Sequence, residues 1–184
     1  MRRTLIEKTN WKLTLFSRHS DRLNIDTTRE IAMHGDVLNK KELRKAIEGQ
    51  DAVFVALSGR LDEMAKVIAD TMYELHVKRI IFISSMGIYN EIPNHIGSNG
   101  NLKFNSFLTP YRKAADIIEK SGLDYTIIRP GWFDNGSDTY TISTKGQLFE
   151  GHNISRQAIA NFVLELLKNP ESYINDSVGI HRPE

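Results

Sequence analysis

Small and polar residues follow the short apolar runs of this 184-residue chain. Such residues are suited to places where a ligand comes close to the main chain, because they leave room and offer hydrogen-bonding groups. In an open parallel sheet, the ligand crevice lies beyond the carboxyl ends of the strands. The segments that would form this edge are Phe16-Ser17-Arg18-His19, His34-Gly35-Asp36-Val37, Ala56-Leu57-Ser58-Gly59, Ser84-Ser85-Met86-Gly87-Ile88-Tyr89 and Arg129-Pro130-Gly131-Trp132.

The apolar runs before these segments are short, rich in β-branched and aromatic residues, and mostly without alternation. This pattern is typical of strands that are covered on both faces. Segments of helical period separate them. The predicted strands include residues 13–16, 53–57, 80–83 and 125–128, and the predicted helices begin at Asn39, before Met64, at Thr109-Pro110 and at Ser155. Asn39, with Glu42 three residues later, resembles a capping box, and we expect Thr109 to be a cap followed by proline at the first helical position.

Alternation of strands and helices at this spacing predicts right-handed crossovers and a mainly parallel sheet. We therefore expect a three-layer α/β fold of Rossmann type with helices on both faces. The length suits a single domain over residues 1–184. The stretch 89–106 is the one long irregular segment, and its place after a central strand favours a functional lid.

Composition excludes several classes of protein. Zero cysteines rule out disulfides, thiolate chemistry and cysteine-ligated metals. A net charge of +1 gives no overall field for nucleic acid or anionic lipid, so we expect neither partner. The six histidines show no metal-ligand spacing, and we predict no metal site. Without a signal peptide or an apolar run near 20 residues, the sequence indicates a cytoplasmic protein.

Taken together, several of these motifs resemble one family. They are Gly35-Asp36, Ala56-Leu57-Ser58-Gly59, Ile83-Ser84-Ser85-Met86-Gly87-Ile88-Tyr89, Lys113 followed by Asp116, and Ser121-Gly122-Leu123-Asp124-Tyr125-Thr126-Ile127-Ile128-Arg129-Pro130-Gly131. The series is similar to the atypical, NmrA-like branch of the short-chain dehydrogenase/reductase superfamily, whose members are NAD(P)H-binding Rossmann proteins. The resemblance covers nearly the whole chain, and its most specific part ends in Arg129-Pro130-Gly131.

The resemblance implies a dinucleotide site. Arg18 stands where the family reads the adenosine ribose, and a guanidinium there accommodates a 2′-phosphate, which favours NADP over NAD. A solvated arginine at a strand end is the alternative. Asp36 resembles an adenine-contacting acid, although an aspartate after glycine is as often a turn residue. The residues implied to surround the cofactor are Ser17, Arg18, Asp36, Val37, Ala56, Leu57, Ser58, Ser84, Lys113, Arg129, Pro130 and Gly131.

The resemblance also implies a catalytic set, which is incomplete here. Ser85 matches the active-site serine and Lys113 the active-site lysine. The family's proton-donating tyrosine lies four residues before that lysine, and Thr109 stands there instead. Tyr89 is the replacement that we expect, because Tyr111 points to another side of its helix. The alternative is that the serines satisfy a strand end and that Lys113 is an ordinary exposed lysine.

A dinucleotide fold of this kind normally opens with a buried strand and a glycine-rich turn that holds the pyrophosphate. The first glycine of this chain is Gly35, and residues 1–9 resemble the second half of a helix. We therefore expect the fold to lack its first strand and that turn, because the sequence begins internally or omits about 20 to 30 residues. Such a loss leaves two half-sheets whose unpaired edges face each other across a gap.

Two functions follow from these expectations. The first is an NADP-preferring oxidoreductase that transfers hydride to a small acceptor, whose identity is unknown, under the 89–106 loop and against Trp132. The second is a redox sensor that binds NADP(H) and acts through a protein partner without turnover. The sequence leaves the oligomeric state open.

Overall fold

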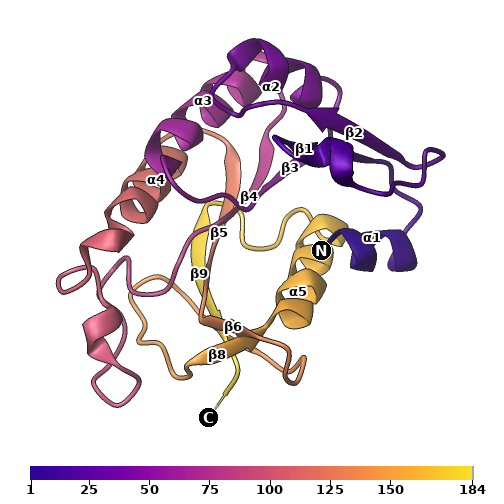
Figure 1. The fold of residues 1–184 in the computed structure, drawn as a ribbon. Coiled ribbons are helices and arrows are strands. Elements are labelled where there is room, and N and C mark those ends of the chain that lie inside the picture. Colours follow the sequence, from indigo (N-terminus) through magenta and orange to yellow (C-terminus); the bar gives the residue numbers. More distant parts are fainter. Residues whose placement is uncertain (184) are drawn as a thin grey trace.

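A computed structural model describes residues 1–183 of the chain, and Figure 1 shows their arrangement. The helices are α1 (Arg2–Lys8), α2 (Lys40–Ile47), α3 (Leu61–Glu74), α4 (Thr109–Glu119) and α5 (Arg156–Lys168), with 3-10 turns at Ser20–Arg22, Ser98–Gly100 and Ser106–Leu108. The strands are β1 (Leu13–Ser17), β2 (Glu30–His34), β3 (Ala52–Val55), β4 (Arg79–Ile83), β5 (Asp124–Pro130), β6 (Trp132–Asp134), β7 (Thr141–Ser143), β8 (Asn153–Ser155) and β9 (Asp176–His181).

The strands form a mainly parallel Rossmann-like arrangement, as the sequence predicts. One sheet has the order β3-β4-β5-β9-β7, in which only β7 runs antiparallel to its neighbour. A separate parallel pair, β1 and β2, lies beside it, and β6 pairs with β8. The predicted α/β class is therefore confirmed. None of the helices within residues 1–183 is long and apolar enough to cross a membrane.

Helices cover both faces of the larger sheet, and strand β4 shows how its residues divide between them. Ile80 and Phe82 pack into the core under α2, α3 and α4, whereas Ile81 packs against α5 on the opposite face. All three side chains are fully buried. An unalternating apolar run is required here because both faces of the strand meet apolar helices.

Side chains cap two of the predicted helices, and the cap at Asn39 is the one that the sequence predicts. The Asn39 side chain accepts hydrogen bonds from the main chain at the start of α2, and Ser155 Oγ accepts from Ala158 N at 2.9 Å at the start of α5. The prediction of Thr109 as a cap is wrong. Thr109 is the first residue of α4, after a 3-10 turn, and Leu108 takes the capping position without a side-chain bond. The preceding turn already sets the helix entry.

The predicted lack of a first strand is not supported as stated, because the structure has an N-terminal strand, β1, after helix α1. What distinguishes this strand is its pairing. Within residues 1–183, β1 pairs with β2 and has no ladder to β3. A cavity of about 760 Å³ lies between β1 and β3. The sheet is therefore interrupted between these two strands, which Figure 1 shows as neighbours.

The irregular segment 89–106 is well packed. The buried Asn101 side chain accepts from Ile92 N at 2.9 Å and donates to Ile92 O at 2.8 Å, which closes the segment on itself. Ile92 and Ile96 pack with Met86 and Phe149 in a small core of their own. These contacts hold the segment against the end of β4, and its role as a lid stays a prediction.

Candidate functional site

The carboxyl ends of the parallel strands meet at one edge, and that edge carries most of the predicted site residues. Ile83 at the end of β4 lies opposite Ile128, and Pro130 at the end of β5 lies opposite Ile180 of β9. The serines after β4 and Arg129-Pro130-Gly131 are thereby brought together. Ser84 N donates to Ile128 O at 2.8 Å, and Met86 N donates to Pro130 O at 3.3 Å.

At the end of β1, Arg18 extends into solvent. Its guanidinium has no hydrogen bond or ion pair within residues 1–183, and Arg22 in the following 3-10 turn is equally free. Ser17 precedes them at the exposed end of β1 and accepts a hydrogen bond from His19 N at 3.2 Å. Two unpaired guanidiniums four residues apart can thus take an anionic ligand at this end of the strand.

Asp36 and Val37 follow β2. Asp36 Oδ1 accepts from Leu38 N at 2.9 Å, so this carboxylate stabilises its own turn, which was the alternative that the sequence left open. Gly35 has a packing role there, because an added Cβ would lie 2.4 Å from the Phe16 ring. The main-chain N–H of Asp36 donates a hydrogen bond to Glu42 Oε2 at 2.9 Å. Within residues 1–183, the Oδ2 atom of Asp36 has no hydrogen-bond partner.

The end of β3 supplies small residues. Ala56 and Ser58 are exposed, and Leu57 is half-buried. Ser17, Val37, Ala56 and Leu57 all line the cavity between β1 and β3. Four of the predicted cofactor residues thus lie around one opening, at or after the carboxyl ends of β1, β2 and β3.

The hydroxyls of Ser84 and Ser85 each contact a main-chain carbonyl oxygen. Ser84 is buried, and its Oγ lies 3.5 Å from Tyr111 O, which is the limit for a hydrogen bond. Ser85 is half-buried and its Oγ donates to Met86 O at 3.0 Å. A hydroxyl bonded to its own neighbour can turn toward a ligand by rotation. Ser85 therefore keeps the capacity to hold an acceptor oxygen.

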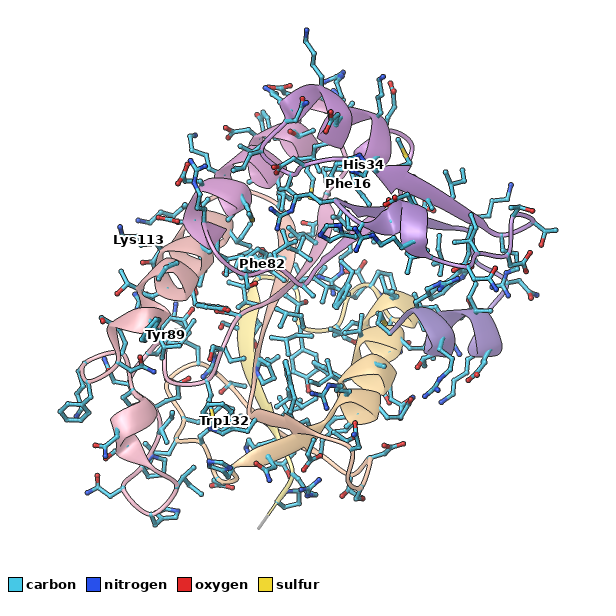
Figure 2. The ribbon with its side chains drawn as sticks, in the orientation of Figure 1. Phe16, His34, Phe82, Tyr89, Lys113 and Trp132 are labelled. Carbon is cyan, nitrogen blue, oxygen red and sulfur yellow. The ribbon has the colours of Figure 1, made fainter. Side chains whose placement is uncertain are left out.

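Figure 2 shows Lys113 and Tyr89 on the same side of the molecule, along α4, but their side chains contact different partners. Lys113 is exposed on α4, and its Nζ lies 4.0 Å from Asp62 at the start of α3. The Tyr89 hydroxyl donates to Glu119 Oε1 at 2.6 Å. Burial, with this hydrogen bond second, raises the pKa of Tyr89 well above its usual range. Tyr89 therefore holds its proton firmly, and its role as proton donor stays a prediction.

Arg129 is fully buried and ties the loop after β4 to β5. Its Nη1 bonds Glu91 Oε1, and its Nη2 donates to Ser177 O at 3.2 Å. Glu91 also accepts from Gly87 N at 3.0 Å and from Tyr89 N at 2.9 Å. Sequence reasoning missed Glu91, because a single acid in an irregular segment carries no periodic signal. The contacts of Arg129 make it a positioning residue for the loop that follows the double serine.

Pro130 and Gly131, which follow Arg129, are buried. An added Cβ at Gly131 would lie 2.5 Å from His152 O, so glycine lets β5 pass close to the segment before β8. Trp132 comes next and is 64% exposed, with its ring stacked on that of His152 at a centroid distance of 6.2 Å. Trp132 is thus available to a ligand, as the prediction of a pocket wall requires.

These residues fit one half of a dinucleotide. The free Arg18 and Arg22 suit the 2′-phosphate, and small residues at the end of β3 leave room for the adenosine. The pyrophosphate would need a turn of glycines with free main-chain N–H groups. Since no glycine precedes Gly35, the described residues offer such a cradle at neither the start nor the end of β1.

Comparisons with known proteins agree with this geometry. A family model described as NAD(P)H-binding matches residues 1–170. The chain is 34% identical over 146 residues to the "Uncharacterized sugar epimerase YhfK" of Bacillus subtilis (strain 168), covering 72% of this chain and 64% of that protein. The chain thus spans less than two thirds of the length of this curated relative.

Solved structures share the fold. A Rossmann-fold NAD(P)-binding family protein from Shigella flexneri superposes with a TM-score of 0.80 at 34% identity, covering 94% of this chain and 81% of that one. A short-chain dehydrogenase/reductase from Veillonella parvula, solved in complex with NADP, gives a TM-score of 0.90 at 23% identity and covers 98% of this chain and 87% of that one.

Proposed function

The chain belongs to the NAD(P)H-binding family, and from that premise we propose that it prefers NADP and, with the reduced cofactor, reduces a small acceptor. The observation that carries the NADP preference is the pair of exposed, unpartnered guanidiniums of Arg18 and Arg22 at the end of β1. A 2′-phosphate dianion matches two such groups, whereas a free 2′-hydroxyl gains little from them. The structure of the Veillonella parvula relative in complex with NADP supports the same cofactor.

In this proposal the bound reduced nicotinamide supplies the hydride. The chain's own residues bind and orient the cofactor and the acceptor. Arg18 and Arg22 hold the adenosine phosphate, and Ala56, Leu57 and Ser58 leave space beside it. Ser85 turns its hydroxyl from Met86 O toward the acceptor oxygen, and Trp132 forms one wall of the acceptor site.

The phosphate preference can be tested without the pyrophosphate cradle. Adenosine 2′,5′-bisphosphate carries adenosine with a 2′- and a 5′-phosphate but no nicotinamide half, and 5′-AMP, which lacks only the 2′-phosphate, is its matched control. We expect calorimetry to show tighter binding of the bisphosphate, and Arg18→Ala to weaken it about 10-fold or more, since hydrogen bonds to charged groups contribute about 1.5–3 kcal/mol. Lys12→Ala, a cation at the opposite end of β1, is the control variant. Equal binding of both nucleotides contradicts the proposal.

A specific observation favours a second function, that of an NADP(H) sensor without turnover. The Tyr89 phenol is bound to Glu119, Lys113 faces Asp62, and Thr109 starts α4, so these contacts assemble no proton-donating set. The absorbance of NADPH with a panel of quinones, flavins and carbonyl compounds separates the two functions. Turnover that Ser85→Ala abolishes supports the reductase. Binding without oxidation of NADPH by any compound supports the sensor.

A further inference from the structure

The cavity between β1 and β3 is bounded by two strand edges. Within residues 1–183, β1 forms a ladder only with β2, and β3 forms one only with β4. Their other edges face the cavity, which is lined along β1 from Lys12 to Ser17 and along β3 from Asp51 to Leu57. Unpaired main-chain N–H and C=O groups on a strand edge form a template for another strand. The cavity, which we call the strand slot, has this template on both sides.

Both edges run in the same direction. Gln50 precedes β3, and its Nε2 donates to Thr14 Oγ1 near the start of β1 at 3.2 Å. The two strands thus begin at the same end of the slot. A segment inserted between them in that direction can pair in parallel with each, as β1 does with β2 and β3 with β4.

The slot is apolar above and below. Leu43, Ala46 and Ile47 of α2, together with Ile68 of α3, line one face, and Leu5 of α1 with Leu166 and Leu167 of α5 line the other. A strand covered on both faces is a continuous run of apolar β-branched residues. At the usual rise, strand spacing and layer thickness, five such residues occupy about 800 Å³. The slot volume is about 760 Å³.

Arg79 marks the amino end of the slot. It lines the cavity and is 8% exposed, and its Nη1 donates to Asp124 O at 3.0 Å. Its Nε and Nη2 are buried without a partner in residues 1–183. Buried guanidinium N–H groups rarely stay unpaired, because an unmet donor costs free energy. A carboxylate at the start of an inserted segment would satisfy them.

We propose that the strand slot binds an extended peptide segment as a further parallel strand between β1 and β3. The segment has about five apolar β-branched residues, preceded by an acidic residue that pairs with Arg79. Its binding joins the two sheets into one continuous sheet. The segment lies between the two strands, and the predicted cofactor residues Ser17, Ala56 and Leu57 line the carboxyl end of the same slot.

The test uses the full chain and a fluorescein-labelled peptide, acetyl-Glu-Val-Val-Val-Ile-Val-Lys-Lys-amide, in which the lysines keep the peptide soluble. We expect saturable binding by fluorescence anisotropy. We also expect slower amide exchange in β1 and β3 with little change in β5. A matched peptide with N-methylated valines keeps the apolar side chains but lacks the main-chain donors, and it should bind at least 10-fold more weakly.

A second comparison isolates Arg79. Replacing the peptide's Glu by Gln should weaken binding about 10-fold to the natural chain, because a charged hydrogen bond exceeds a neutral one. In Arg79→Met the two peptides should bind alike. Arg44→Met, which changes an exposed arginine of α2, is the control and should keep the difference.

Three results overturn the proposal. They are no binding of the Glu peptide, equal binding of the N-methylated peptide, and protection that falls outside β1 and β3. Sedimentation adds a fourth. If the free chain forms dimers in which β1 and β3 are already protected from exchange, a second copy occupies the slot.

Discussion

Two regions of the sheet are built from the same kind of short apolar sequence, yet their burial differs. In the closed region, Ile80, Ile81 and Phe82 of β4 are fully buried, with strands on both edges and helices on both faces. In the open region, Leu13 to Phe16 of β1 are only half-buried. An apolar run is thus fully shielded only when both faces and both edges are covered, and its sequence alone does not show whether a partner strand lies beside it.

The largest expected effect is at Arg129, a buried arginine of the closed region. In the closed region, Arg129→Met leaves Glu91 buried without its cation, which should lower the free energy of unfolding by about 3–5 kcal/mol. Urea denaturation measures this loss. Lys145→Met removes an exposed partner of Glu119 and should cost at most about 1 kcal/mol. A similar loss for both variants would show that burial of the pair does not matter.

Truncations in the two regions sharpen the comparison. Ile81→Ala creates a cavity in the closed core and should cost about 2–5 kcal/mol. Leu15→Ala lies beside the strand slot, where its side chain is half-buried, and should cost about 1 kcal/mol because less apolar area is lost. Equal losses in urea denaturation would mean that β1 is as tightly enclosed as β4.

The next expected effect concerns pH and helix α1, which covers one face of the strand slot. A hydrogen bond from Arg2, at 2.5 Å, lowers the pKa of Glu30 from about 4.5 to about 2. A lowered pKa stabilises the fold above the unfolded value and loses that effect as pH falls through the folded value. We therefore expect a stability loss between about pH 4.5 and pH 2 that Glu30→Gln removes.

Urea midpoints measured across this pH range test the prediction. The control is Glu171→Gln, which changes an exposed carboxylate. In this variant the urea midpoint should depend on pH as it does in the natural chain. If Glu30→Gln also leaves the pH dependence of the urea midpoint unchanged, the contact between α1 and β2 contributes nothing to the pH dependence of stability.

The smallest effect is expected at Arg79, which begins β4 and lines the strand slot. Arg79→Met removes two unpaired buried nitrogens together with the bonds to main-chain carbonyls, so the gain and the loss of stability nearly cancel. We expect a change in unfolding free energy below about 1 kcal/mol, against the several kcal/mol of Arg129→Met. A loss as large as that of Arg129→Met would show that Arg79 is fully satisfied.

The sequence predicted much of this fold, because periodicity and capping residues act locally. The apolar stripes located α2 to α5, and Asn39 and Ser155 marked two helix starts correctly. The prediction of Thr109 as a helix cap was wrong because a 3-10 turn directly precedes α4, so that Thr109 is already its first residue. Whether β1 and β3 pair depends on contacts distant in sequence, which no local pattern reports, and the expected gap between two half-sheets came from the family resemblance alone.

The candidate site was predicted less completely. Strand ends identified the edge, and four predicted cofactor residues line one opening there. The sequence could not show that Tyr89 donates to Glu119 or that Arg129 pairs with Glu91, since both partners lie about 30 residues or more away along the chain. Side-chain roles at this edge depend on such distant partners, so residue type alone was insufficient.

The most direct test of the open region is amide hydrogen exchange, residue by residue, in the free chain. In a parallel strand, alternate N–H groups point to opposite edges. If β1 and β3 each face an open slot, every second amide of both strands exchanges rapidly while the amides of β4 and β5 stay protected. Uniform protection along β1 and β3 would show that the two edges are already paired, and the central claim would be wrong.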